Sequence, residues 1–120
     1  LAFTGVCTTE MCTVSEGFEQ YESLNAVVLG ISADSIFSQE AWAKANKITI
    51  PLLSDFNSEV MTKYGTKYPD GGFVLGLNGV SKRAAFVVDK NGKVAYAEVL
   101  ENAGELPNFE KIKEVLKTLK

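Results

Sequence analysis

Residues 84–100, "AAFVVDKNGKVAYAEVL", carry the strongest secondary-structure signal of the chain. Two runs rich in valine, alanine and aromatic residues flank the dipeptide Asn91-Gly92, which is typical of the turn in a β-hairpin. The segment therefore predicts two antiparallel strands joined by a short turn.

The chain before this hairpin contains two further strand signals. Residues 25–32, "NAVVLGIS", form a nearly continuous apolar run, which is typical of a strand covered on both faces. Residues 48–55, "ITIPLLSD", predict another strand, in which Pro51 indicates an edge position or a bulge. Residues 66–81 are rich in glycine and aromatic residues but show no clear period, so we expect a long loop there.

Helical patterns lie between these strands. Apolar residues recur at spacings of three and four after Cys7, which predicts a helix over residues 8–22. Residues 38–46, "SQEAWAKAN", predict a short helix with Ser38 as its N-cap and Trp42 as its largest buried side chain.

Two more helices follow along the chain. Residues 57–65, "NSEVMTKYG", predict a short helix that begins at an Asn57 cap and stops at Gly65. The C-terminal segment, "PNFEKIKEVLKTLK", predicts a closing helix with an apolar stripe. The stripe consists of Phe109, Ile112, Val115, Leu116 and Leu119.

The order of these segments indicates one α/β domain over residues 1–120, with a central mixed β-sheet flanked by helices. Strands alternate with helices first, and a hairpin and a helix then close the chain. The helix over residues 8–22 has little sheet to pack on unless a central strand precedes Cys7. We therefore expect a chain shortened at its N-terminus, without the strands that lead into this helix.

The composition excludes several classes of function. The chain has 120 residues, of which 46% are hydrophobic and 22% charged, as in ordinary globular domains. Its net charge of −3 gives no electrostatic reason to bind nucleic acid or a membrane. No apolar run approaches the roughly 20 residues of a membrane span. The first residues also lack the basic and apolar regions of a signal peptide.

The cysteine and histidine counts narrow the chemistry further. Two cysteines are too few for a disulfide scaffold, so we expect a reducing, cytoplasmic compartment. The sequence contains no histidine, which removes Ser-His-Asp, Cys-His and histidine-metal chemistry. A structural zinc site takes four ligands, usually Cys and His, so we expect no metal ion and no cofactor.

Cys7 lies before or within the first turn of the predicted helix, after Thr4, Gly5 and Val6. Unpaired backbone N–H groups and the positive end of the helix dipole meet there, and both favour the nucleophilic thiolate. The Thr4 hydroxyl is placed to donate to the sulfur. Because Cys7 falls on the apolar face of the helix, we expect it at the floor of a pocket. A buried, inert cysteine is the alternative that its position leaves open.

Cys12 follows five residues later and is rotated toward the wetter side of the helix, near Ser15, Glu16 and Glu19. In an ideal helix the Cα atoms of Cys7 and Cys12 are roughly 9 Å apart. Disulfides rarely bridge Cα atoms beyond about 7 Å. The two sulfurs can therefore join only if the start of the helix unwinds, which argues against a static disulfide and leaves a switchable one open.

Arg83 is the only arginine in the chain and stands at the start of the first hairpin strand. If this strand runs antiparallel to the strand expected before Cys7, Arg83 lies at the same edge of the sheet as the cysteine. Its guanidinium would then stabilise a thiolate and offer bidentate donors to a substrate oxygen. Glu10, one turn into the helix, is placed to hold the guanidinium. A solvated arginine at the end of a strand is the simpler alternative.

The stretches "AFTGVCTTE" and "KRAAFVVDKNGKV" together resemble a peroxiredoxin of the alkyl hydroperoxide reductase/thiol-specific antioxidant family. The family signature is Pro-x-x-x-Thr/Ser-x-x-Cys, and its last two fixed positions match Thr4 and Cys7. The strand-start arginine of the family matches Arg83, and the glutamate three residues after the reactive cysteine matches Glu10. The segment "SADSIFSQEAWAKANKITIPLLSDFN" also resembles the family, so the similarity covers essentially the whole chain.

This resemblance implies a thioredoxin-like fold and the reduction of hydrogen peroxide or alkyl hydroperoxides. Cys7 would be the peroxidatic cysteine, which attacks the peroxide and becomes a sulfenic acid. Backbone N–H groups near Val6 and Cys7, together with Thr4 and Arg83, would bind the substrate and stabilise the departing oxygen. The implied partners are the hydroperoxide and a thioredoxin-like or low-molecular-weight thiol reductant, and a homodimer or higher oligomer is left open.

The role of Cys12 is also left open. Its spacing from Cys7 is similar to that of the resolving cysteine in the bacterioferritin-comigratory subclass, in which local helix unwinding closes the disulfide. Other members of the family use one cysteine and an external thiol. Two further functions compete with the peroxidase: a thioredoxin-like redox sensor or binding module without turnover, and a structural or chaperone-like assembly.

Overall fold

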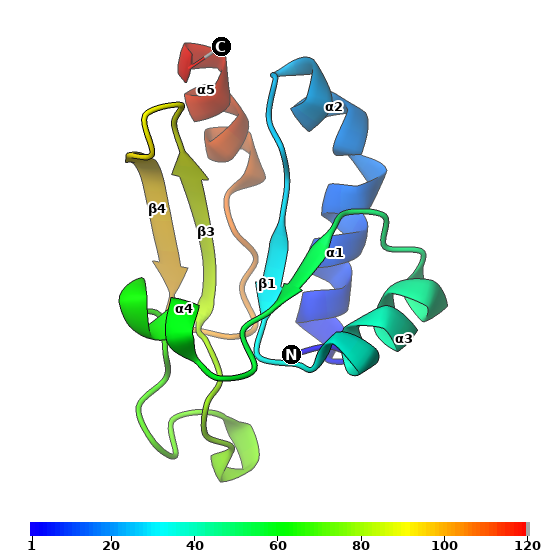
Figure 1. Ribbon diagram of the computed structural model, residues 1–120, viewed down its shortest axis with the longest axis vertical. Helices are drawn as coiled ribbons and strands as arrows, with labels where there is room; N and C mark the ends of the chain where they lie inside the picture. The colour runs from blue at the N-terminus through cyan, green and yellow to red at the C-terminus, as the bar shows by residue number, and fades with distance from the viewer. Residues whose placement is uncertain (120) are drawn as a thin grey trace.

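Two pairs of strands form the framework on which the helices pack (Figure 1). β1 (Gly30–Ser32) pairs in parallel with β2 (Leu52–Ser54), and β3 (Arg83–Val88) pairs antiparallel with β4 (Val94–Leu100). Within residues 1–119, which the computed structural model describes, the two pairs are not hydrogen-bonded to each other. The predicted mix of parallel and antiparallel strands is therefore present, as one parallel pair in one half of the molecule and one antiparallel pair in the other.

The helices confirm the predicted α/β class. They are α1 (Gly5–Glu16), α2 (Phe18–Ser23), α3 (Ile36–Asn46), α4 (Glu59–Lys63), the 3₁₀ turn η1 (Val74–Gly76) and α5 (Phe109–Leu119). Figure 1 shows α1 and α3 on the side of the β1–β2 pair and α5 beside the β3–β4 pair. The order of strand and helix along the chain is the one expected from the sequence.

The buried core lies between the first three helices and the chain that leads into β2. It consists of Val14, Tyr21, Trp42, Ile48 and Ile50. Phe109, Ile112 and Leu116 of α5 pack against this core, as their predicted apolar stripe requires.

Trp42 connects the core to the start of α1. Its side chain is buried as predicted, with only 3% of the residue exposed. The indole Nε1 donates a hydrogen bond to Thr8 Oγ1 at 3.0 Å. Because Thr8 directly follows Cys7, this bond fixes the position of α3 relative to the first turn of α1.

The close approach of α1 to β1 depends on the absence of a side chain at Gly30. A Cβ atom at this position would lie 2.7 Å from Cδ2 of Leu52 and 3.3 Å from the sulfur of Met11. Met11 belongs to α1, one turn after Cys7. The separation of the helix from the strand is therefore set at this residue.

The helix predicted over residues 8–22 is in fact two helices. α1 begins earlier than expected, at Gly5, and α2 begins at Phe18 after a break at Gly17. The Gly17 N–H donates to the carbonyl of Thr13 at 3.1 Å and closes the last turn of α1. The prediction was wrong because the apolar spacing continues across Gly17, where a glycine costs a helix about 1 kcal/mol relative to alanine.

The strand predicted over residues 25–32 is much shorter, since only Gly30–Ser32 form β1. The expectation that both of its faces are covered was also wrong. Val27, Leu29 and Ile31 alternate along one face and are 85%, 52% and 51% exposed. The continuous apolar run thus hides a period of two, which is typical of a segment buried on one face.

The strand predicted over residues 48–55 is likewise reduced to Leu52–Ser54. Pro51 lies immediately before β2, where its missing N–H breaks no ladder bond, and its carbonyl accepts from the Gly30 N–H at 2.9 Å. In the described part of the chain β1 is the only partner of β2, so the predicted edge position is confirmed.

The N-cap predicted for the helix around Trp42 was wrong by three residues. Ser35, not Ser38, occupies the N-cap of α3, and its side chain accepts from the Ser38 N–H at 3.2 Å. Ile36 and Phe37, which were left outside the predicted helix, form its first turn on the exposed side.

The start of α4 is also held differently from the prediction. Asn57 does not cap it; instead the carboxylate of Asp55 accepts from the N–H groups of Val60 and Met61 at 2.9 and 2.8 Å. A carboxylate at this end of a helix satisfies unpaired N–H groups and interacts favourably with the helix dipole. Gly65 lies just beyond the end of the helix, as predicted.

The loop and the hairpin follow the expectation most closely. Residues 66–81 are irregular apart from η1 and a single bridge between Lys67 and Ser81. The hairpin turn contains Gly92 at φ +77°, a conformation that favours glycine. A bulge between Val87 and Val88 shifts the register of the two strands. Within residues 1–119, no helix has both the length and the apolar character needed to cross a membrane.

We predict that Trp42→Phe lowers the free energy of unfolding by about 1–3 kcal/mol, because it removes the donor to Thr8 and leaves a void in the core. Urea denaturation measures this change. Phe37→Leu is the matched control on the same helix, since Phe37 is 76% exposed; we expect a change within about 0.5 kcal/mol. Equal losses for the two variants would contradict the prediction.

Candidate active site

Cys7 lies in the first turn of α1, as predicted, with Thr4 at the N-cap. The thiol is half-buried. The first N–H groups of a helix have no acceptor within it, and the side chain of Thr4 does not cap them. The backbone N–H groups of Val6 and Cys7 belong to this set, and the sulfur lies in the same turn, at the positive end of the helix dipole.

Thr4 lies beside the sulfur, but its hydroxyl is shared. Its Oγ1 is 2.6 Å from the carbonyl oxygen of Leu1, to which it donates. A hydrogen bond from Thr4 also contributes to lowering the pKa of Cys7. One hydroxyl proton cannot serve both acceptors fully, and the 2.6 Å distance to Leu1 favours the carbonyl as its main acceptor.

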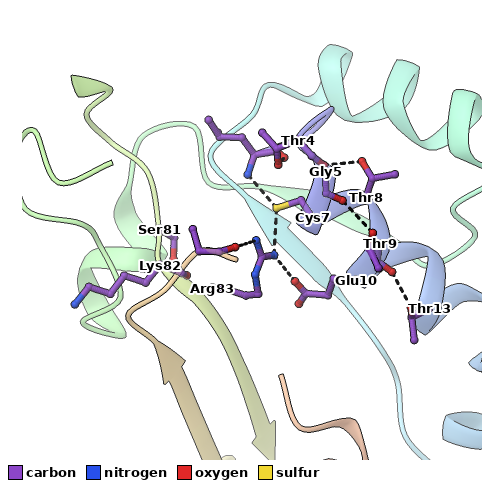
Figure 2. Close-up of polar contacts among 12 residues, drawn as sticks. Thr4, Gly5, Cys7, Thr8, Thr9, Glu10, Thr13, Ser81, Lys82 and Arg83 are labelled. Atoms are coloured by element: carbon purple, nitrogen blue, oxygen red, sulfur yellow. Dashed lines mark hydrogen bonds and ion pairs between the residues drawn. The ribbon is translucent and has the colours of Figure 1, made fainter. Parts of the chain in front are cut away.

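Arg83 reaches the sulfur from the other half of the molecule (Figure 2). Its Nη1 donates to Cys7 Sγ at 3.3 Å and to Glu10 Oε2 at 2.6 Å. Its Nη2 donates to the carbonyl of Ala103 at 3.0 Å. Arg83 is the first residue of β3, so the predicted meeting of this strand end with Cys7 is present in the structure.

The Arg83–Glu10 ion pair is nearly shielded from solvent. The two side chains are 8% and 11% exposed. Burial raises the pKa of Glu10, whereas the hydrogen bond and the positive charge of Arg83 lower it. Glu10 thus holds the guanidinium in place, the role that the sequence suggested for it. The alternative of a solvated strand-end arginine is excluded.

Three of the N–H bonds of the Arg83 guanidinium donate to Glu10, Cys7 and Ala103. A guanidinium has five N–H bonds. Among the described residues, the Nε of Arg83 is buried and has no hydrogen-bond partner. A buried donor without an acceptor is unfavourable, and the other hydrogen bonds of the guanidinium offset this cost.

The pKa of Cys7 is lowered by its surroundings. Burial of the thiol raises its pKa, whereas hydrogen bonds from Thr4 and Arg83 lower it. The thiolate also raises the pKa of Arg83, which keeps the guanidinium charged. The Cys7 sulfur thus contacts a buried guanidinium and does not lie in a purely apolar environment.

Cys12 lies in the same helix but belongs to a different environment. It is half-buried, and its thiol is 3.6 Å from the carbonyl oxygen of Asn46 at the end of α3. A shallow pocket of about 260 Å³ adjoins it. This pocket is lined by Cys12, Ser15, Glu16, Asn46, Lys47 and Thr49. The neighbours Ser15 and Glu16 were expected, whereas the contact with α3 was not.

Both cysteines are free thiols in this structure. The structure thus brings Cys7, Thr4, Arg83 and Glu10 together and leaves Cys12 outside this group. The contact of Arg83 with the carbonyl of Ala103 was not predicted. Every residue has a backbone carbonyl, and the residue types do not show which one accepts a hydrogen bond. Among residues 1–119, no group of three or more histidine, cysteine or acidic side chains could hold a metal ion.

The fold and the site define an α/β protein with an activated cysteine at a helix N-terminus. A family model described as "AhpC/TSA family" matches residues 1–97. The chain belongs to this family, as its resemblance indicated.

Relatives of known name support this assignment. The chain is 36% identical to a peroxiredoxin from Ignicoccus hospitalis, over 98% of this chain and 50% of that protein. It is 32% identical to "2-Cys peroxiredoxin BAS1, chloroplastic" from Hordeum vulgare, over 82% of this chain and 47% of that protein. The chain therefore spans about half the length of these relatives.

Solved structures support the fold. Peroxidoxin BcpB from Mycobacterium tuberculosis superposes with a TM-score of 0.84 at 28% identity, over 100% of this chain and 75% of that chain. A peroxiredoxin-like protein from Aquifex aeolicus gives a TM-score of 0.83 at 31% identity, over 98% of this chain and 66% of that chain. The fold is thioredoxin-like, as predicted.

We predict that Arg83→Lys raises the pKa of Cys7, because lysine loses the forked contact that holds a cation against both the sulfur and Glu10. Ultraviolet absorbance of the thiolate, followed against pH in a Cys12→Ser background, measures Cys7 alone. Because the pKa in the parent is lowered, its thiolate forms at lower pH, and the variant curve should move to higher pH.

The control for this titration is Lys82→Gln. Lys82 precedes Arg83 and pairs with Glu101, which is 79% exposed, rather than with the sulfur. Its removal should leave the curve of Cys7 in place. An equal shift for Lys82→Gln and Arg83→Lys would show that general surface charge, not the contact with the sulfur, sets the pKa.

Proposed function

We propose that this chain carries the active site of a thiol-dependent peroxidase that reduces hydrogen peroxide and alkyl hydroperoxides. The observation that carries the proposal is the position of Arg83 Nη1, which donates both to Cys7 Sγ and to Glu10. A single cation is thus fixed beside an activated sulfur in a site without histidine. The names of the relatives, peroxiredoxin and 2-Cys peroxiredoxin, agree with this chemistry.

The proposed reaction begins with attack of the Cys7 thiolate on the terminal oxygen of the peroxide. The S–O bond forms as the O–O bond breaks, and the sulfur loses two electrons to the peroxide. Cys7 becomes a sulfenic acid, and the other oxygen leaves as water or an alcohol after it takes up a proton.

The donors around the sulfur would provide most of the acceleration. A low pKa supplies thiolate, but nucleophilicity falls together with pKa, so it does not by itself explain a fast reaction. Negative charge develops on the departing oxygen as the O–O bond breaks. The N–H groups of Val6 and Cys7 and the guanidinium of Arg83 are fixed in advance to stabilise that charge.

We predict that the chain consumes hydrogen peroxide in the presence of a thioredoxin-type or low-molecular-weight thiol, and that Cys7→Ser abolishes this activity. Arg83→Met should lower kcat/KM by about 10²–10³, the loss expected for a donor that stabilises a developing oxyanion. Lys82→Gln serves as the charge-loss control and should retain the parent activity.

One outcome would instead favour the redox-sensor function. If Cys7 reacts once with peroxide but the protein shows no sustained turnover with any thiol reductant, the peroxidase proposal is wrong. An assembly function would show as a property of the chain that survives Cys7→Ser unchanged.

For the second half of the cycle we propose Cys12 as the resolving cysteine. Its thiol would attack the sulfenic acid of Cys7, releasing water and forming a disulfide that an external dithiol reduces. Both cysteines lie in α1, so the first turns of this helix must unwind for the sulfurs to meet. The contact of Cys12 with Asn46 is a weak thiol hydrogen bond, which offers little resistance to this movement.

We predict that one equivalent of peroxide converts the reduced protein to a Cys7–Cys12 disulfide, because the sulfenic acid lies in the same helix as a free thiol. Thiol mapping by mass spectrometry detects it as a loss of two hydrogens between the two cysteines. Cys12→Ser should stop at the sulfenic acid. A stable sulfenic acid on Cys7 beside a free Cys12 in the parent chain would exclude the resolving role.

A further inference from the structure

Asp34, which lies two residues after β1, makes a long-range contact with the start of the chain. Its Oδ2 accepts a hydrogen bond from the backbone N–H of Ala2 at 2.8 Å. The same oxygen accepts from the hydroxyl of Ser32 at 2.8 Å. One carboxylate oxygen therefore connects the end of β1 to the residues that enter α1.

The buried side-chain amide of Gln39 orients the hydrogen bond between Ser32 and Asp34. Gln39 is only 3% exposed, and its Nε2 donates to Ser32 Oγ at 2.8 Å and to the carbonyl of Leu53 at 2.9 Å. Because a carboxylate oxygen can only accept, the Ser32 hydroxyl donates to Asp34 while its oxygen accepts from Gln39. The Asp34 carboxylate is thus held in place by residues of β1, β2 and α3.

The segment that Asp34 holds is a tight turn directly before the reactive cysteine. Phe3 has φ +63°, which is uncommon for a residue with a side chain. Thr4 closes the turn by donating its hydroxyl to Leu1 at 2.6 Å. Thr4 is also the N-cap of α1, so the position of this turn determines where the first turn of the helix and its sulfur lie.

We propose that Asp34 is a positioning residue for the reaction of Cys7: its carboxylate holds the 1–4 turn so that Thr4 and the sulfur face Arg83. Asp34 does not touch the sulfur. The claim that it affects the peroxide step rests on the proposed function, whereas the claim that it orders the turn does not.

This role is separable from the capping of α3. The N-cap of α3 is the neighbouring Ser35, whose hydroxyl accepts from the Ser38 N–H. The other long-range contact of Asp34 is made by its main-chain carbonyl, which accepts from Ser54 Oγ at 2.7 Å. Replacing the carboxylate therefore leaves both of these bonds in place.

The test compares Asp34→Ala with Asp34→Asn in the full chain. Alanine removes the acceptor, and we expect oxidation of Cys7 by peroxide to slow about tenfold, since misplacing reacting groups by about 1 Å can cost up to about a hundredfold. Asparagine keeps an oxygen at the same position and should stay within about threefold of the parent, since a neutral hydrogen bond is only modestly weaker. Ser35→Ala is the control and should not alter this rate.

Amide hydrogen exchange of residues 2–8, followed by NMR, gives a second measurement that does not involve peroxide. Asp34→Ala should speed exchange in this segment, and Asp34→Asn and Ser35→Ala should not. If Asp34→Ala matches the parent in both measurements, or if asparagine slows oxidation as much as alanine does, the proposal is wrong. If the parent itself reacts with peroxide no faster than a free thiol, the proposed function fails, and the exchange data alone still decide the role of Asp34.

Discussion

The buried ion pair between Arg83 and Glu10 is the interaction on which the rest of the structure depends. It joins α1 to β3, and thus the parallel half of the molecule to the antiparallel half, whose strands are not hydrogen-bonded to each other within residues 1–119. Removing two charges from water is costly unless they pair closely and their other hydrogen-bonding groups are satisfied. Here the guanidinium donates to Glu10, Cys7 and Ala103, and only its Nε lacks a partner among the described residues, so the same residues that unite the two halves also form the site.

The ion pair with Glu10 fixes where the positive charge of Arg83 lies and at the same time weakens that charge. Glu10 offsets much of the positive charge of Arg83, so the guanidinium is not primarily a source of strong attraction for the sulfur. The guanidinium contributes mainly through its fixed orientation, because Nη1 lies between the carboxylate and the sulfur and Nη2 donates to the carbonyl of Ala103. The thiolate is favoured by several modest contributions around a helix end, each opposed by burial.

Local signals in the sequence were sufficient for much of the fold. The hairpin around Asn91-Gly92 and the closing helix were predicted because turn chemistry and apolar period agree there. The early strands and helix ends were predicted poorly. The cap of α4 comes from Asp55, two residues before the predicted Asn57, and the exposed face of β1 follows from which helices cover it. An apolar run alone does not carry that information.

The side chains of the site were predicted from the sequence, whereas the backbone contacts that hold them in place were not. Cys7, Thr4, Glu10 and Arg83 could be named because their types and spacing have a chemical meaning, and a family motif unites them. The carbonyl of Ala103 and the bond from Ala2 to Asp34 depend on backbone geometry, which no spacing rule expresses. The absence of a side chain at Gly30 is another feature that helps to position the site and was not predicted from the sequence. A single methyl group there would meet Leu52 and Met11, and so would push on the helix that carries Cys7. The position of the Cys7 sulfur therefore depends in part on the contact between α1 and β1, through a residue that contributes no atom to the site.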